Sequence, residues 1–186
     1  QLCSGDRFCY GMTGTYCWFW KSERRCLYCS IGLNKDQDAN QKTIKQLIEV
    51  LGVAISDPVL PAKHILLGGG TPEGDDMGAI LASQLCREIK KVYNTSCYVM
   101  ISAPLKNEYI DLLRDSGADE LGINLEFYSE SAWEQFIPGK NKYIGRKRYF
   151  NALEYSVKVF GPINTRSILI VGLEQPENTI EGAVSL

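Results

Sequence analysis

Cysteines gather near the amino end of this sequence in a pattern suited to binding a metal centre. Five of the seven cysteines fall within the first 29 residues, and Cys26 and Cys29 form a Cys-x2-Cys pair. This spacing lets two sulfurs face one centre, and thiolates bind zinc or an iron–sulfur cluster. Further thiolate ligands could come from Cys3, Cys9 or Cys17. Three cysteines would leave one iron of a cubane open, whereas structural zinc would need two ligands besides the pair.

The number and placement of the cysteines disfavour a disulfide framework. The count is odd and the crowding is confined to the amino end, so thiolate ligands in a reducing compartment are the better interpretation. We therefore expect a cytoplasmic protein. Cys86 and Cys97 stand alone later in the chain and are expected to be small buried hydrophobic residues.

Glycine-rich and polar residues follow or end several apolar runs. Gly68-Gly69-Gly70-Thr71-Pro72 follows the run 64–67, and its glycines would let a ligand approach the main chain closely. It is not a phosphate loop, because no Gly-Lys-Ser/Thr follows.

A second polar set lies within the apolar run 121–127. Period-two alternation places Asn124 and Glu126 on one face of the expected strand, where an amide and a carboxylate would suit a ribose diol. The run 165–171 ends at Gly172, with Glu174 beyond it. Each of these sets also fits an ordinary turn or a solvated strand face.

Strand and helix signals alternate at intervals of about 30 residues, which is typical of βαβ units and a parallel sheet. Helical patterns cover 38–56, 77–93, 108–116, 146–160 and the residues from 177 onward, and expected strands cover 8–16, 64–67, 97–102, 121–127 and 165–171. A full eight-stranded barrel needs about 250 residues. We therefore predict an α/β fold, a partial parallel (β/α) barrel truncated at the C-terminus.

The predicted fold is one domain whose parts have different tasks. Residues 1–16 would supply an N-terminal segment with the first strand, 17–35 the cluster-binding loop, and 36–186 the βα repeats. In such folds chemistry takes place at the carboxyl ends of the strands, where the glycine and polar sets fall.

Charge and hydropathy exclude several classes of partner. The 20 basic and 22 acidic residues nearly cancel, so no overall attraction to nucleic acid or anionic membrane is expected. No run of about 18 apolar residues exists that would span a bilayer. Five cations and two tyrosines in 140–149 would suit RNA or an acidic peptide, but a solvated helix start is the better interpretation.

Taken in this order and spacing, the motifs resemble those of the radical S-adenosylmethionine (radical SAM) superfamily, and within it the biotin synthase and lipoyl synthase type. Cys26-Leu-Tyr-Cys29-Ser is similar to part of the family's cysteine loop, and the segment 68–72 to its glycine-rich strand end. Asn124-Leu-Glu126 resembles its ribose-binding motif, and 167–174 its fifth-strand signature beside the adenine. The resemblance spans residues 17–186. The family usually spaces its cysteines Cys-x3-Cys-x2-Cys, whereas position 22 here is Ser22.

The resemblance implies an oxygen-sensitive enzyme with a four-iron four-sulfur (4Fe-4S) cluster and S-adenosylmethionine as cofactors. The implied cluster ligands are Cys26, Cys29 and, as the nearest upstream thiol, Cys17, with Cys9 as the alternative to Cys17. One electron would cleave the cofactor to methionine and a 5′-deoxyadenosyl radical. That radical would abstract hydrogen from a small organic substrate in a biosynthetic step such as sulfur insertion, rearrangement or methylation. The implied partners are this substrate and an electron donor such as flavodoxin or ferredoxin.

The resemblance also implies a set of cofactor-binding residues. Tyr28 would lie against the adenine, and Arg148, with Arg166 next, would neutralise the cofactor carboxylate. The full set is Tyr28, Gly68, Gly69, Gly70, Thr71, Ser102, Asn124, Glu126, Arg148, Arg166 and Gly172. Two rival hypotheses remain, a zinc-containing and an iron–sulfur-containing binding module without radical chemistry, the former contacting RNA or a peptide.

Overall fold

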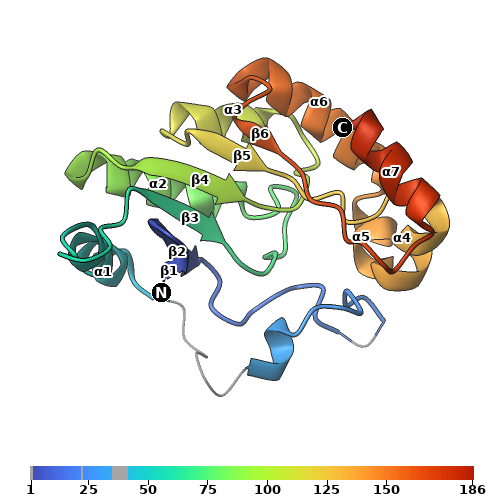
Figure 1. Cartoon of the computed structure of the whole chain (residues 1–186), viewed down its shortest axis with the longest axis horizontal. Coiled ribbons are helices and arrows are strands. Elements are labelled where there is room, and N and C mark those ends of the chain that lie inside the picture. Colours follow the sequence, from blue (N-terminus) through green and yellow to red (C-terminus); the bar gives the residue numbers. More distant parts are fainter. Residues whose placement is uncertain (1, 22, 35–41) are drawn as a thin grey trace.

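The computed structural model describes residues 2–21, 23–34 and 42–186, and Figure 1 shows a curved sheet with helices along its outer side. The strands are β1 (Leu2–Ser4), β2 (Arg7–Gly11), β3 (His64–Gly68), β4 (Ser96–Met100), β5 (Glu120–Gly122) and β6 (Thr165–Arg166). The helices are α1 (Ile44–Ile55), α2 (Ala79–Val92), α3 (Glu108–Asp115), α4 (Glu130–Phe136), α5 (Pro138–Tyr143), α6 (Arg146–Phe160) and α7 (Pro176–Ser185), with a 3-10 turn η1 (Ile31–Asn34).

The strands lie in chain order, β1-β2-β3-β4-β5-β6, and β2 to β6 are parallel. Of the described strands, β1 alone runs antiparallel, paired with β2. Sequential parallel strands joined by helices confirm the predicted α/β class. Because the strands are parallel, their carboxyl ends meet at one edge of the sheet, where the connecting loops gather.

The hydrophobic core lies between the sheet and its outer helices. Ile65 and Leu67 of β3, Val99 of β4 and Ile89 of α2 are fully buried. Alternation along a strand then turns the intervening side chains toward the inner, concave side of the sheet. Cys86 and Cys97 have no exposed surface, as predicted for small apolar residues.

Several predicted elements differ in extent from the observed ones. The strand expected over 8–16 lies earlier, at β2, and the short antiparallel β1 before it was not predicted. β5 ends at Gly122 and β6 at Arg166, and a single bridge between Glu126 and Leu169 continues the pairing. Regular extended backbone does not resume through the predicted end of this strand, because Glu126 has a φ of 68°.

Two short helices, α4 and α5, occupy a stretch for which no element was predicted. The helix expected from residue 38 begins at Ile44, where Thr43 and Gln46 form a capping box; its predicted start at 38–41 lies outside the described residues. Within the described residues, no helix is long and apolar enough to cross a membrane.

Candidate functional site

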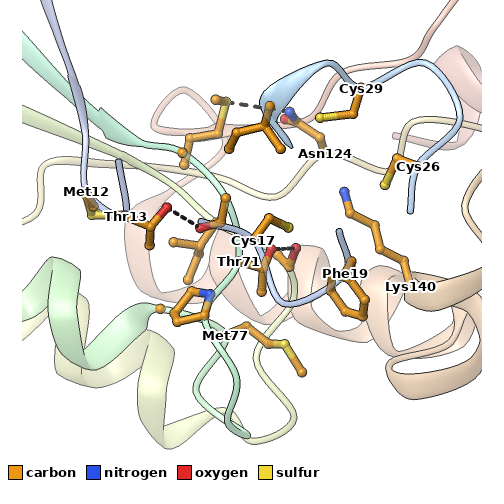
Figure 2. Close-up of a pocket in the computed structure, with 18 of the residues that line it drawn as sticks. Met12, Thr13, Cys17, Phe19, Cys26, Cys29, Thr71, Met77, Asn124 and Lys140 are labelled. Atoms are coloured by element: carbon orange, nitrogen blue, oxygen red, sulfur yellow. Dashed lines mark hydrogen bonds between the residues drawn. The ribbon is translucent and has the colours of Figure 1, made fainter. Parts of the chain in front are cut away.

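A cavity of about 200 Å³ opens at the carboxyl ends of β3, β4 and β5. The loop that follows β2 covers it from one side and α5 from another (Figure 2). Its lining includes the predicted residues Cys17, Cys26, Tyr28, Cys29, Gly69, Gly70, Thr71, Ser102, Asn124 and Glu126. Residues from five separate segments of the sequence therefore share one cavity.

The three candidate ligand cysteines all line this cavity. Cys17, Cys26 and Cys29 are free thiols and partly buried, whereas Cys9 lies on β2, is disulfide-bonded and is not part of the lining. The predicted absence of disulfides therefore does not hold for Cys9. Burial raises the pKa of the Cys26 thiol, and the nearby positive charge of Lys140 opposes that rise. Among the described residues, no three His, Cys, Asp or Glu side chains are grouped closely enough to hold one metal ion, as a structural zinc would require.

The glycine segment after β3 is the surface on which the cysteine loop rests. A Cβ atom at Gly70 would lie 2.1 Å from the Tyr16 carbonyl oxygen and 2.7 Å from the Cys17 Cβ, so only glycine fits. The Trp18 amide donates to the Thr71 carbonyl at 2.7 Å, and the Thr13 hydroxyl donates to the Gly70 carbonyl at 3.2 Å. The loop thus approaches the strand end through main-chain contacts.

Hydroxyl and amide groups from neighbouring strand ends point into the cavity. Thr71 and Ser102, which follow β3 and β4, share a buried hydrogen bond of 2.8 Å. The Asn124 amide nitrogen lies 3.5 Å from the Met100 sulfur, and its buried Oδ1 has no hydrogen-bond partner among the described residues. Buried amide oxygens are almost always satisfied, so this one is available to a ligand.

Glu126 and Lys140 form an ion pair in the cavity wall. Their Oε1 and Nζ atoms are 3.1 Å apart, and the side chains are only 11% and 13% exposed. Glu126 also has a left-handed backbone, with a φ of 68°, a conformation that is unfavourable for this residue type and is often found at functional sites. The carboxylate and its partner are therefore held in a defined place at some energetic cost.

Lys140 lines the cavity and is a residue that the sequence analysis missed. The interpretation of 140–149 as a solvated helix start is wrong for Lys140, whose amino group points toward the side of the cavity with Cys26, Cys29 and Asn124 (Figure 2). Burial disfavours its charged form, but Tyr149 and Glu126 outweigh burial, and its pKa lies well above the ordinary value. Gly139, the residue before Lys140, lets α5 pack directly against the Arg24 carbonyl of the loop.

Four predicted residues do not line this cavity. Arg148 donates to the Pro104 carbonyl at 2.6 Å and to Asn107 at 2.8 Å, and Arg166 pairs with Glu120 at 2.5 Å. Gly172 lies beyond the short β6, and Gly68 lines a neighbouring cavity on the inner side of the sheet.

Comparison with known proteins identifies the family of this chain. The model of the Radical SAM superfamily matches residues 15–186, and the chain therefore belongs to this superfamily. Its domain is that of a radical SAM enzyme, with the predicted partial parallel barrel. No curated protein matches the sequence. The narrower likeness to biotin and lipoyl synthases stays a prediction.

Several solved structures share the fold. The FeFe-hydrogenase maturase HydG from Carboxydothermus hydrogenoformans has a TM-score of 0.72 at 15% identity, covering 96% of this chain and 39% of that one. Methylornithine synthase (PylB) has a TM-score of 0.71 at 15% identity, covering 94% and 48%. Coproporphyrinogen III oxidase (HemN) from Escherichia coli, described as a radical SAM enzyme, has a TM-score of 0.51 at 16% identity, covering 76% and 34%. This chain spans less than half the length of each.

Proposed function

We propose that this chain holds the 4Fe-4S cluster and S-adenosylmethionine of a radical SAM enzyme that abstracts hydrogen from a small organic substrate. The observation that carries the proposal is the common cavity of Cys17, Cys26 and Cys29, which opens onto the glycine-rich end of β3. Thiolates are the ligands of iron–sulfur clusters, and three of them leave one iron free for a cofactor.

Each part of the cavity has a task under this proposal. The three cysteines would hold the cluster, which when reduced would supply the electron for cleavage of S-adenosylmethionine to methionine and a 5′-deoxyadenosyl radical. The unpaired Oδ1 of Asn124 accepts a hydrogen bond from a ribose hydroxyl, next to the Glu126 carboxylate. The main chain at Gly69 and Gly70 allows a ligand close approach. Tyr28 lines the cavity and packs edge-to-face against Phe127, with their ring centroids 5.9 Å apart, which leaves it placed to contact an adenine.

Lys140 takes the role that the sequence suggested for Arg148. Its ammonium is the cation of the lining, and it lies among groups that carry or bind negative charge. A fixed positive charge here favours the cofactor carboxylate and offsets the charge of a thiolate-bound cluster. Apolar side chains complete the wall, among them Met12 and Phe19, which are 2% and 1% exposed and keep water from that side of the cavity.

Reconstitution tests the proposal directly. The protein is loaded with iron and sulfide without oxygen and reduced with S-adenosylmethionine present, and 5′-deoxyadenosine is measured. We expect its formation to fall to background in Cys26→Ala and Cys29→Ala and to persist in Cys86→Ala, whose thiol lies in the core away from the cavity. A colourless protein that holds only zinc would contradict the proposal. A Cys17→Ala variant that still loads a full cluster would contradict the assignment of Cys17 alone.

A further inference from the structure

Basic side chains from the cysteine loop and from α5 gather on one part of the surface. Lys21, Arg24 and Arg25 lie in one tight turn, because the Arg24 and Arg25 amides both donate to the Lys21 carbonyl, at 2.9 and 3.0 Å. Lys142 on α5 joins them, since its ammonium and the Arg24 guanidinium lie over the same ring, that of Tyr143, at 5.4 and 5.3 Å. We call these four cations, Lys21, Arg24, Arg25 and Lys142, the basic patch.

The positive charge of the basic patch is not neutralised by ion pairs. Elsewhere an exposed lysine pairs with an acid, as Lys158 does with Glu154 at 2.7 Å. Among the described residues, no carboxylate lies within ion-pair distance of any cation of the basic patch. The same turn contains one acid, Glu23, and the chain as a whole has a net charge of −2. The patch is therefore a local field of one sign, which attracts and orients a partner of the opposite charge.

The aromatic rings beside the basic patch are covered by its own cations. The Arg24 guanidinium lies over the ring of Trp18 at 4.9 Å, and the Arg25 guanidinium over that of Trp20 at 5.8 Å. Trp20 also packs against Gly32, where a Cβ atom would collide with the ring. Single-stranded nucleic acids bind basic surfaces by stacking bases on free ring faces. A folded acidic protein fits better, because arginine, tyrosine and tryptophan are the residues enriched at protein interfaces.

The basic patch lies next to the candidate cluster ligands. Arg25 directly precedes Cys26, whose thiol lines the cavity together with that of Cys29. On α5, Lys142 is two residues from Lys140, whose ammonium lies in the cavity wall. Under the proposed function, each cleavage needs one electron from outside the chain, and the rate of electron transfer falls steeply with distance. A protein seated on the basic patch would bring its redox group close to the cysteines.

We propose that the basic patch is the docking surface of a small acidic protein that delivers this electron. The step transfers one electron, so the redox group of the donor is oxidised and the cluster is reduced, and no bond forms or breaks. Delivery of the electron rests on the proposed function, whereas docking itself needs no cluster. Exposed charges of this kind mainly raise the rate of encounter and make it dependent on salt. The competing explanation is a solvated surface whose cations only keep the loop soluble.

Binding of flavodoxin, as an acidic electron-donor protein, tests the docking surface. Its dissociation constant is measured with the full chain, without a cluster, at low and at high ionic strength. We expect the constant at low ionic strength to rise about tenfold or more in a double variant with Arg25→Glu and Lys142→Glu, because two attractive charges become repulsive. Added salt should weaken the parent complex more than that of the variant.

A control variant carries the same change of net charge on the outer helices. Arg87→Glu on α2 combined with Lys158→Glu on α6 should leave the dissociation constant unchanged, since both side chains are exposed and lie outside the basic patch. Equal weakening in the two double variants would show that only net charge matters and would overturn the proposal. Flavodoxin binding that is unchanged in the patch variant, with binding of an oligouridylate lost instead, would assign the patch to nucleic acid and overturn it as well. Lys142→Glu alone serves if the patch double variant does not fold.

The choice of reductant tests delivery of the electron. In cluster-loaded protein, the patch double variant should form 5′-deoxyadenosine about tenfold more slowly than the parent with reduced flavodoxin and at the parent rate with dithionite. An equal loss with both reductants would show that the substitutions disturb the cluster site, and it would overturn the delivery role. A parent chain that binds flavodoxin through the patch but forms no 5′-deoxyadenosine with dithionite counts against the proposed function alone.

Discussion

The loop that carries the three cysteines and the sheet beneath it are held in place in different ways. The sheet and its outer helices share one continuous core in which residues such as Leu67, Ile89 and Leu121 are fully buried. In the loop over 12–34, the described residues form only turns, bends and the short η1. We call the sheet and its outer helices the frame. The position of a residue in the frame is therefore fixed by many weak contacts, whereas the position of a residue in the loop depends on a few specific ones.

The loop contacts are easily identified. Main-chain hydrogen bonds join Trp18 to Thr71 at 2.7 Å and Leu27 to Phe136 at 2.9 Å, and the Gly139 amide donates to the Arg24 carbonyl at 3.2 Å. The loop is thus attached to the end of β3 on one side and to α4 and α5 on the other. This arrangement makes the site sensitive to single substitutions that the frame would tolerate.

The ion pair under the loop gives the largest expected effect. Lys140→Met leaves Glu126 buried without its partner, and we expect a loss of about 3–5 kcal/mol in the free energy of unfolding. The matched change in the frame is Lys158→Met, because Lys158 and Glu154 are 64% and 71% exposed in a pair at 2.7 Å. An exposed pair of this kind contributes at most about 1 kcal/mol. Denaturant unfolding of both variants makes the comparison.

Equal losses of unfolding free energy in Lys140→Met and Lys158→Met would show that the buried ion pair contributes no more to stability than an exposed one. A Lys140→Met, Glu126→Gln double variant sharpens the test. It should recover part of the loss, since the uncompensated carboxylate is then gone.

The close contact between Gly70 and the cysteine loop gives the second-largest expected effect. Gly70→Ala places a methyl group 2.1 Å from the Tyr16 carbonyl oxygen, so the loop or the strand end must move, at a cost of roughly 1–3 kcal/mol. Cluster loading, followed by iron content and visible absorbance, should fall more strongly than stability, because Cys17 is displaced with the loop. Gly11→Ala is the control, since its nearest atom would be 3.8 Å away. Full cluster loading in Gly70→Ala would show that the loop adapts and that this contact does not fix it.

The same difference explains how far the sequence could predict the structure. The elements of the frame and its buried residues could be predicted well, because burial there follows the periodicity of the sequence. Examples are the apolar runs of β3 and β4 and the helical spacing of apolar residues in α2. The glycine segment could be recognised by its place after a strand, and the Asn124–Glu126 pair by alternation within an apolar run. Gly69, Gly70 and both members of the pair line the cavity. Lys140 and Arg148 could not be told apart, because their surroundings depend on the turn between α5 and α6. Periodicity carries no information on which of several neighbouring cations turns inward.

The smallest effect concerns the aromatic contacts that fasten the loop to α5. The Arg24 guanidinium lies over the rings of Trp18 and Tyr143, at 4.9 and 5.3 Å, whereas Arg25 lies over Trp20 alone, at 5.8 Å, and is exposed. We expect Arg24→Ala to lower the free energy of unfolding by about 1 kcal/mol and Arg25→Ala by less than about 0.5 kcal/mol, because partly buried cation–π contacts are the stronger ones. Denaturant unfolding measures the difference, and Arg24→Lys should retain part of the stability by keeping a cation over the rings. Similar losses for Arg24→Ala and Arg25→Ala would mean that the loop is attached by its main-chain hydrogen bonds alone, with the aromatic cluster acting only as packing.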